Sequence, residues 1–357
     1  MSERSDVVIL GAGVVGLSTA WQLARRGAKV LVLDQANPGG QGSRAAAGVG
    51  IPSLRLLDDD PMVQLTSAGG KVLVEDLAAL GLARRPTETL RPVVNAKVRG
   101  LLEAAARRAP ELVGRWLPSQ EVAELEPALA GGQFEGAFLC EHGGMVDIEA
   151  YIGGLLAAAS RAGAQVKLGQ QVVEVREEDQ GVVVRCATAT WRCDRLVVAA
   201  GAWAGQLAGL TPLPVRPLRG QMLRIFHPEV SLSRIVSGPS YLAPWRGGEI
   251  VVGATEEDAG FAPYSTPEGL LHLTAVVARL APRLREARFV QTWAGLRAAT
   301  PNGRPMIGRY PATRRVFLGS GHGGQGILCG GLTGRLLVDL LDGESPELLR
   351  HFAPTPA

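Results

Sequence analysis

The stretch from Val7 to Asp34 constrains the fold of this chain more than any other, because three requirements of dinucleotide binding coincide in it. A short apolar run, Val7 to Leu10, leads into Gly11-Ala-Gly-Val-Val-Gly16, then into a helix-like segment, and then into a second apolar run that ends at Asp34. The first glycine permits a tight turn, and the helix N-terminus offers N–H groups to a pyrophosphate. Asp34 lies where a carboxylate accepts hydrogen bonds from a ribose diol. The motif predicts a dinucleotide site and leaves open whether the ligand is a nicotinamide or a flavin.

Composition favours a soluble globular chain of two domains. The sequence has 357 residues, of which 46% are hydrophobic and 20% are charged. The formal net charge of +3 is small for this length and does not indicate nucleic-acid or membrane binding. No apolar run is long enough to span a bilayer, so no integral membrane segment is predicted. The N-terminus lacks the pattern of a signal peptide, and we expect a cytoplasmic protein.

The cysteines and histidines show no metal-binding pattern. The four cysteines, Cys140, Cys186, Cys193 and Cys329, are scattered, and their spacing is unlike a zinc site. We expect buried free thiols in a reducing compartment. The five histidines are also dispersed. We therefore predict no metal.

The middle of the chain alternates predicted helices and strands. Helices are expected near residues 64–80, 99–108, 148–162 and 270–280, the third capped by Asp147. Residues 165–168, 172–176, 181–186, 188–193 and 196–201 are expected to form separate short strands. A hairpin is expected between residues 241–245 and 249–255. The end of the chain returns to a strand at residues 316–319 and a glycine-rich loop before a helix from Ile327 to Leu341. In that loop His322 is interpreted as a structural or cofactor-edge residue rather than a base.

Several motifs, in this order, resemble the flavin amine oxidases of the D-amino-acid oxidase superfamily, and the glycine oxidase and sarcosine oxidase branch most of all. They are GAGVVG with Asp34, SRAAAG at 43–48, VVAAGAW at 197–203, WAGLRAATPNGRPMIG at 293–308 and GHGGQGI from Gly321. The resemblance implies FAD and an α/β (α+β mixed) fold. A Rossmann-type FAD-binding domain of residues 1–80, 145–212 and 296–357 would be interrupted by a substrate domain. Residues 81–144 and 213–295 would form that domain around a large mixed or antiparallel β-sheet.

The resemblance also assigns roles to individual residues. Arg297 matches the arginine that pairs with the substrate carboxylate, and a planar guanidinium suits that bidentate grip. Tyr241 matches a tyrosine whose hydroxyl helps to hold the same carboxylate. The predicted FAD contacts are Gly11, Ala12, Gly13, Val14, Val15, Gly16, Asp34, Gln35, Ser43, Arg44, Ala46, Ala47, Gly48, Val173, Ala200, Gly201, Trp203, Gly323, Gly324, Gln325, Gly326 and Ile327.

Three departures from the family pattern refine this expectation. The segment after Arg297, Ala298 to Gly303, has no cysteine that could attach FAD covalently, so non-covalent FAD is predicted. The strand Ile250 to Gly253 lacks the lysine that promotes reaction with oxygen in the sarcosine oxidase branch. Gly323 and Gly324 stand where some glycine oxidases carry a cation, which implies a roomier pocket or one substrate contact fewer.

The predicted function is FAD-dependent oxidative deamination of a small amino acid or secondary amine, such as glycine, sarcosine or a D-amino acid. Hydride transfer from Cα to flavin N5 would give a 2-oxo acid, ammonia or an amine, and hydrogen peroxide, with dioxygen as the expected acceptor. A glycine substrate would imply a role in thiamine biosynthesis. A homo-oligomer is possible. The alternatives are a flavin dehydrogenase of an amino acid or 2-hydroxy acid that passes electrons to a quinone or partner subunit, and a non-catalytic dinucleotide-binding scaffold.

Overall fold

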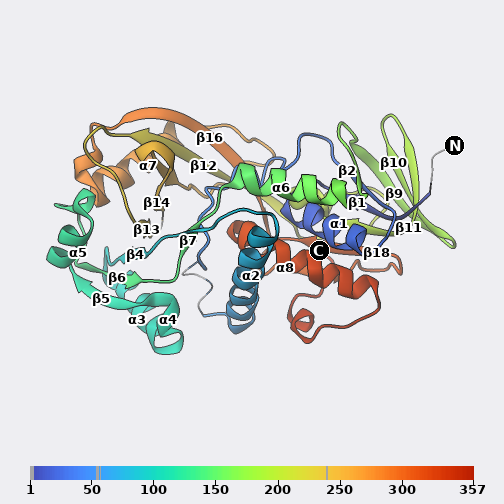
Figure 1. The fold of residues 1–357 in the computed structure, drawn as a ribbon, viewed down its shortest axis with the longest axis horizontal. Helices are drawn as coiled ribbons and strands as arrows, with labels where there is room; N and C mark the ends of the chain where they lie inside the picture. The colour runs from blue at the N-terminus through green and yellow to red at the C-terminus, as the bar shows by residue number, and fades with distance from the viewer. Residues whose placement is uncertain (1–3, 54–55, 57, 239) are drawn as a thin grey trace.

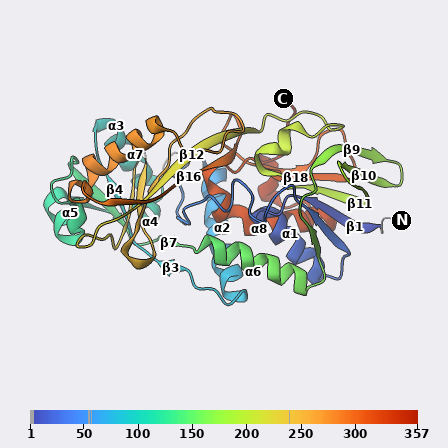
Figure 2. The same ribbon diagram turned by 90° about the horizontal axis from the view of Figure 1, so that it is seen from above.

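Two eight-stranded sheets lie toward opposite ends of the long axis of the molecule (Figures 1 and 2). The computed structural model describes residues 4–53, 56, 58–238 and 240–357. The first sheet has the order β17-β18-β11-β1-β2-β8, with β9 and β10 attached to β11. Its strands are β1 (Ser5–Leu10), β2 (Val30–Leu33), β8 (Gln165–Lys167), β9 (Val172–Glu178), β10 (Gly181–Cys186), β11 (Thr190–Val198), β17 (Met306–Arg309) and β18 (Val316–Ser320).

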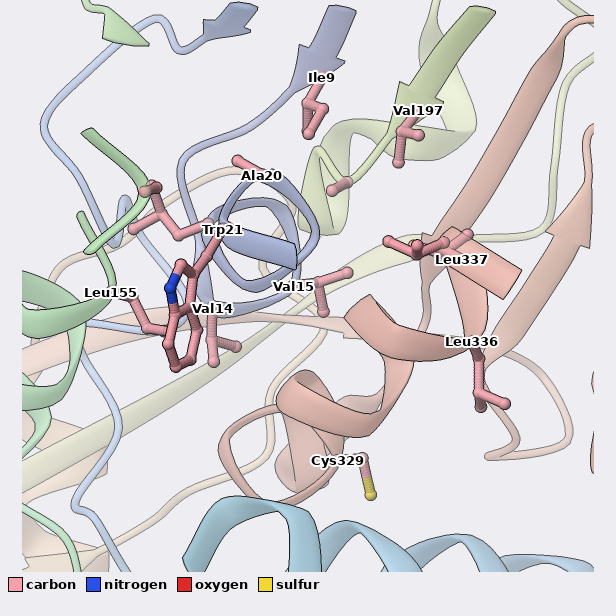
Figure 3. Close-up of a cluster of buried hydrophobic side chains, with 14 of the residues drawn as sticks. Ile9, Val14, Val15, Ala20, Trp21, Leu155, Val197, Cys329, Leu336 and Leu337 are labelled. Atoms are coloured by element: carbon pink, nitrogen blue, oxygen red, sulfur yellow. The ribbon is translucent and has the colours of Figure 1, made fainter. Parts of the chain in front are cut away.

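The centre of the first sheet is parallel, as expected for buried apolar runs joined by helices. β1 pairs in parallel with β2 and β11, β2 with β8, and β11 with β18. Four helices contribute to the core on one face: α1 (Val14–Arg25), α2 (Asp60–Ala79), α6 (Ile148–Arg161) and α8 (Gly326–Leu341). Figure 3 shows how this core joins segments far apart in the sequence, with Val14, Val15 and Trp21 of α1 near Leu155 of α6 and Leu337 of α8.

The other face of the first sheet packs on a second core that includes β9 and β10. The prediction of separate strands at residues 188–193 and 196–201 was wrong, because β11 is continuous from Thr190 to Val198. Its first half pairs antiparallel with β10, and its second half pairs in parallel with β1 and β18. One strand thus serves two ladders. Sequence periodicity cannot show this, because the pairing partners lie elsewhere in the chain.

The second sheet is largely antiparallel and has the order β16-β12-β15-β14-β13-β4-β6-β5. β13 and β4 form its parallel pair. The strands are β4 (Thr89–Pro92), β5 (Arg115–Pro118), β6 (Gly136–Cys140), β12 (Arg216–Phe226), β13 (Ile235–Ser237), β14 (Tyr241–Pro244), β15 (Ile250–Gly253) and β16 (Arg288–Ala299). A separate ladder joins β3 (Arg85–Pro86) to β7 (Gly144–Met145).

The two faces of the second sheet differ in what they pack against. One face, with Leu223, Leu242 and Val252, packs against α7 (Pro267–Leu280) in an apolar core. The opposite face carries Tyr241, Met222 and Val251, which meet Ala47 of the loop that follows β2. Because side chains alternate along a strand, this second face is the one that meets the N-terminal segment of the chain.

The expected helices are present, with shifted ends. The helix expected at 64–80 is α2, which ends at Ala79 with Leu80 as its C-cap; residues 99–108 fall in α3 (Ala96–Arg108), and residues 270–280 in α7. Asp147 caps α6 as predicted, accepting the N–H of Ala150 at 3.2 Å. The predicted hairpin is formed by β14 and β15 around the turn Arg246–Gly248. The short helices are α4 (Pro110–Val113), α5 (Ser119–Leu125), η2 (Pro127–Leu129), η3 (Gly201–Gln206), η4 (Arg246–Gly248), η5 (Pro282–Leu284), η6 (Gly323–Gln325) and η7 (Glu347–His351).

The expected fold class is confirmed: an α/β mixed architecture with a parallel Rossmann-type sheet and a second, largely antiparallel sheet. The division at the stated domain boundaries stays a prediction. All four cysteines are buried free thiols, as expected. In the described part of the chain, no helix has both the length and the apolar character needed to cross a membrane.

Candidate active site

The turn after β1 has the backbone geometry that its glycines predict. Gly11 has φ +106, in the left-handed region that favours glycine, and its N–H donates to Leu33 O at 2.8 Å. A side chain at Gly16 would overlap the carbonyl of Gly11, so glycine lets α1 pack against the turn. Gly13 is the N-cap of α1 and supplies no side-chain hydrogen bond. The first turn of α1 therefore presents backbone N–H groups at the carboxyl edge of the parallel sheet, where nucleotides bind in folds of this type.

Asp34 and Ser43 close around this turn. The Asp34 carboxylate accepts the N–H of Ala12 at 2.6 Å and the N–H of Ala36 at 2.8 Å. Ser43 Oγ accepts the N–H of Val14 at 3.1 Å. These bonds join β2 and the Ser43 loop to the first turn of α1. The structure thus brings together the predicted contacts from Gly11 to Gly16, Asp34 and Ser43.

The Ser43–Gly48 loop is fixed against β16. Trp293 Nε1–H donates to Ala45 O at 3.0 Å. Gly295 has no side chain at the point of closest approach, where an added Cβ would overlap that of Ala45. Ala47 and Gly48 are buried, whereas Arg44 is exposed and donates to Pro38 O at 3.2 Å. Small side chains let this loop pass between the two sheets.

Arg297 and Tyr241 lie on one face of the second sheet. Tyr241, Gly253, Met222 and Trp293 stand in register across four adjacent strands. Arg297 is four residues after Trp293 and therefore faces the same way. A Cβ added at Gly220 would lie 2.7 Å from three atoms of the Arg297 guanidinium, so the guanidinium rests over that glycine.

The two predicted carboxylate contacts differ in their present partners. Arg297 Nη1 donates to Thr255 O at 2.9 Å. The Tyr241 hydroxyl donates to Met222 Sδ at 3.4 Å. Burial raises the pKa of Tyr241 to about 12, although the nearby Arg297 opposes the shift. The phenol is therefore neutral near pH 7 and can donate a hydrogen bond to an anion beside Arg297.

Tyr241 packs against an apolar wall on this face of the second sheet. Ala47, Met222, Val251 and Ala254 form a buried cluster, and the half-buried Trp245 and Trp293 pack against it. Sequence reasoning missed Met222, Thr255 and Gly220, because a methionine, a threonine or a glycine in a strand pattern carries no signal of its own. Strand register places Met222 and Gly220 on the face of Arg297, and the hydrogen bonds of Thr255 with Gln221 place its carbonyl beside the guanidinium.

The glycine-rich end of the chain begins α8 with a buried polar pair. His322 and Thr333 are joined at 2.9 Å between Nε2 and Oγ1. Burial lowers the pKa of His322 to about 4, so its ring is neutral near pH 7. Gln325, at the N-cap of α8, is buried, and its Oε1 has no hydrogen-bond partner among the described residues. Gly323 and Gly324 have open space where a Cβ would stand.

The remaining predicted contacts lie around the same edge or farther away. Gly201 begins η3 with φ +54, and its carbonyl accepts the hydroxyl of Ser320 at 2.8 Å. Trp203 packs against Phe261, with ring centroids 5.0 Å apart and ring planes tilted by 35°. Val173 lies in β9, and Gln35 is exposed just after β2. The roles of all these residues in binding FAD stay predictions. Across the described ranges, no group of His, Cys, Asp or Glu is arranged to hold a metal ion.

Two observations fit FAD. The first turn of α1 offers backbone N–H groups to a pyrophosphate beside an ordered carboxylate. At the start of α8, the unpartnered amide oxygen of Gln325 is an acceptor suited to a ring N–H, of the kind found in an isoalloxazine. Gly11 to Gly16, Asp34 and Ser43 would hold the ADP part, and Gln325 with the Ser43–Gly48 loop would hold the ring.

Comparison with known proteins agrees with this arrangement. A family model described as FAD dependent oxidoreductase (DAO) matches residues 6–340. The bifunctional protein ThiO/ThiG of Trichormus variabilis is 33% identical over 97% of this chain, which spans about half (54%) of that relative's length. The glycine oxidase of Geobacillus kaustophilus is 29% identical over 99% of this chain and 97% of its own. Its crystal structure superposes with a TM-score of 0.88, covering 99% of both chains. The iminodiacetate oxidase of Chelativorans sp. BNC1 is 30% identical, with a TM-score of 0.87 and coverage of 98% and 100%.

Proposed function

Because this chain belongs to the DAO family of FAD-dependent oxidoreductases, we propose that it oxidises a small amino acid or a secondary amine that carries a carboxylate. The observation that supports this substrate class is the placement of the Arg297 guanidinium and the Tyr241 hydroxyl on one face of the second sheet, opposite the Ser43–Gly48 loop. Arg297 would donate two parallel hydrogen bonds to the substrate carboxylate, and the Tyr241 hydroxyl would donate another.

The protein acts mainly by positioning its substrate. FAD, when bound, supplies the acceptor for the hydride that leaves the substrate Cα. Arg297 and Tyr241 would fix the carboxylate, and the apolar wall of Ala47, Met222 and Val251 would face the apolar part of the substrate. A substrate that binds as the neutral amine needs no protein base, and His322 is already engaged with Thr333.

A second candidate keeps the same reaction on the substrate but differs in the electron acceptor. All four lysines of the sequence, Lys29, Lys71, Lys97 and Lys167, lie outside the strands of the second sheet. The chain therefore lacks a lysine on the face of Arg297. The absence of this lysine supports, as the second candidate, a dehydrogenase that passes electrons to a quinone or a partner protein rather than to dioxygen.

The test is anaerobic mixing of the FAD-loaded enzyme with glycine, sarcosine, iminodiacetate, D-amino acids and 2-hydroxy acids. Loss of the oxidised flavin absorbance with an amine substrate is the expected result. Bleaching by hydroxy acids alone would overturn the amine assignment. Admission of air then separates the two acceptors, because an oxidase regains its absorbance and releases stoichiometric hydrogen peroxide, whereas a dehydrogenase needs an added quinone.

A further inference from the structure

Behind Arg297, on the α7 side of the second sheet, lies a polar group of five residues that we call the Glu257 cluster: Arg219, Gln221, Thr255, Glu257 and Thr266. Arg219 and Gln221 flank Gly220 on β12, so their side chains face away from the side on which the Arg297 guanidinium rests. Gln221, Thr255 and Arg219 are buried, with 0%, 6% and 7% exposure. Such a buried polar group requires an explanation, because polar atoms are costly to bury unless they are satisfied.

The carboxylate of Glu257 is the centre of the cluster. It accepts hydrogen bonds from Nε of Arg219 at 3.1 Å and from Nη2 of the same residue. It also accepts one from Gln221 Nε2 at 2.7 Å and one from the hydroxyl of Thr255. Burial alone would raise the pKa of Glu257, but the hydrogen bonds from Thr255, Arg219 and Gln221 outweigh it and hold the pKa below its ordinary value. The carboxylate stays ionised near pH 7 and balances the charge of Arg219.

The cluster is tied to the N-terminus of α7 as well. Thr266 N–H donates to Gln221 Oε1 at 2.7 Å, and Gln221 Nε2 lies 3.0 Å from Thr266 Oγ1. Thr266 is also the N-cap of α7, where its hydroxyl accepts the N–H of Gly269 at 3.2 Å. The Gln221 amide is thereby locked between a carboxylate and a helix start, which makes the cluster rigid.

Thr255 connects this rigid cluster to Arg297. Its Oγ1 accepts the N–H of Gln221 at 2.9 Å, and its own N–H donates to Gln221 O at 3.2 Å. Its carbonyl, fixed in this way, accepts Arg297 Nη1 at 2.9 Å. In the described part of the chain, no carboxylate forms an ion pair with Arg297. The direction of the guanidinium is therefore set by the Thr255 carbonyl and by the open space over Gly220.

We propose that Glu257 and Thr255 are positioning residues for carboxylate recognition: through the Thr255 carbonyl they fix the orientation in which Arg297 meets its ligand. Bidentate hydrogen bonding requires the plane of the guanidinium to match that of the carboxylate. A small rotation of the guanidinium therefore weakens binding although its charge is unchanged. This inference rests on the proposed function, in which Arg297 binds the substrate carboxylate.

The experiment titrates the FAD-loaded enzyme with acetate and with its neutral isostere acetamide, following the flavin absorbance. Thr255→Val removes both side-chain bonds but keeps the backbone carbonyl, and Thr255→Ser restores both. Glu257→Gln removes the charge at nearly constant shape. Asp258→Asn is the matched control, because Asp258 is next to Glu257 in sequence and forms an exposed ion pair with Arg216 of β12 at 2.8 Å.

We expect Thr255→Val and Glu257→Gln to raise the Kd for acetate about tenfold, the equivalent of one hydrogen bond, and to leave acetamide unchanged. Thr255→Ser and Asp258→Asn should bind acetate like the parent enzyme. FAD content and Tm, measured on the same samples, distinguish a misoriented Arg297 from an unfolded protein.

Two results overturn different statements. If Arg297→Ala weakens acetate binding while folded Thr255→Val and Glu257→Gln bind it as the parent does, the positioning role is wrong and the proposed function stands. If Arg297→Ala itself leaves acetate binding unchanged, the assignment of Arg297 to the carboxylate fails, and the positioning role fails with it. Should Glu257→Gln not fold, the pair Thr255→Val and Thr255→Ser decides the question.

Discussion

A single methyl group at position 220 should separate recognition of the carboxylate from stability of the fold. Gly220 lies in β12 with an ordinary backbone conformation, so alanine is permitted there. An alanine Cβ would stand 2.7 Å from Cζ, Nη1 and Nη2 of Arg297. Carbon and nitrogen atoms in contact need about 3.5 Å, so the guanidinium must move by roughly 1 Å.

The cost of that movement falls mainly on binding. The guanidinium is the end of a flexible side chain and can shift, so the free energy of unfolding should drop by less than the roughly 1–3 kcal/mol of an overpacked core. A displaced guanidinium loses its hydrogen bond to Thr255 O and the orientation needed to bind the ligand carboxylate. Loss of a charged hydrogen-bonded pair costs about 2–5 kcal/mol, so the KM for an amino-acid substrate should rise by roughly 30-fold or more.

The assay compares KM, the Kd for acetate, FAD content and Tm for Gly220→Ala and for a control. Gly153 of α6 is the matched control, because an added Cβ there meets nothing within 4 Å. Gly153→Ala should keep KM and increase stability by about 0.5–1 kcal/mol, as alanine is the better helix former. A folded, FAD-loaded Gly220→Ala enzyme with unchanged KM and acetate affinity would refute the placement of Arg297 in the binding site.

Three other predictions test separate parts of the site. Tyr241→Phe should raise KM by about two- to tenfold through loss of one hydrogen bond, whereas Tyr310→Phe, which removes a buried hydroxyl bonded to Thr211 O at 2.9 Å, should lower Tm and leave KM unchanged. Asp34→Ala should weaken FAD binding at least tenfold, measured by release of free flavin fluorescence. Asp6→Ala, which removes a carboxylate that accepts the Lys29 N–H at 2.8 Å at the other end of the sheet, should retain FAD. Burial lowers the pKa of His322 to about 4 from its ordinary 6.5, so the unfolded chain binds a proton that the folded chain does not as the pH falls through this window. The free energy of unfolding should therefore decline by about 3 kcal/mol between pH 6.5 and 4. In denaturant titrations over this pH range, His322→Gln should show a smaller decline. An equal decline in the parent and the variant would contradict a buried, neutral His322.

Much of the fold could be predicted from local pattern. The run from Val7 to Asp34 specified strand, turn and helix because each glycine in it answers a local backbone requirement. The same reasoning found the N-cap at Asp147 and the hairpin around Arg246–Gly248. It failed at β11, which continues through residues expected to break it, because both of its ladders are made with strands distant in the sequence.

The sequence by itself determined the family and its FAD cofactor and predicted the candidate arginine, because the glycine motif and the arginine motif are recognisable residues in a fixed order. Tertiary structure decided what surrounds them. Only the register of β12, β15 and β16 puts Gly220 beneath Arg297 and Thr255 beside it, and only the face of β12 separates the apolar wall from the Glu257 cluster. Contacts across strands depend on pairing over tens of residues, and no local pattern in Arg219 to Met222 encodes which partner each side chain meets.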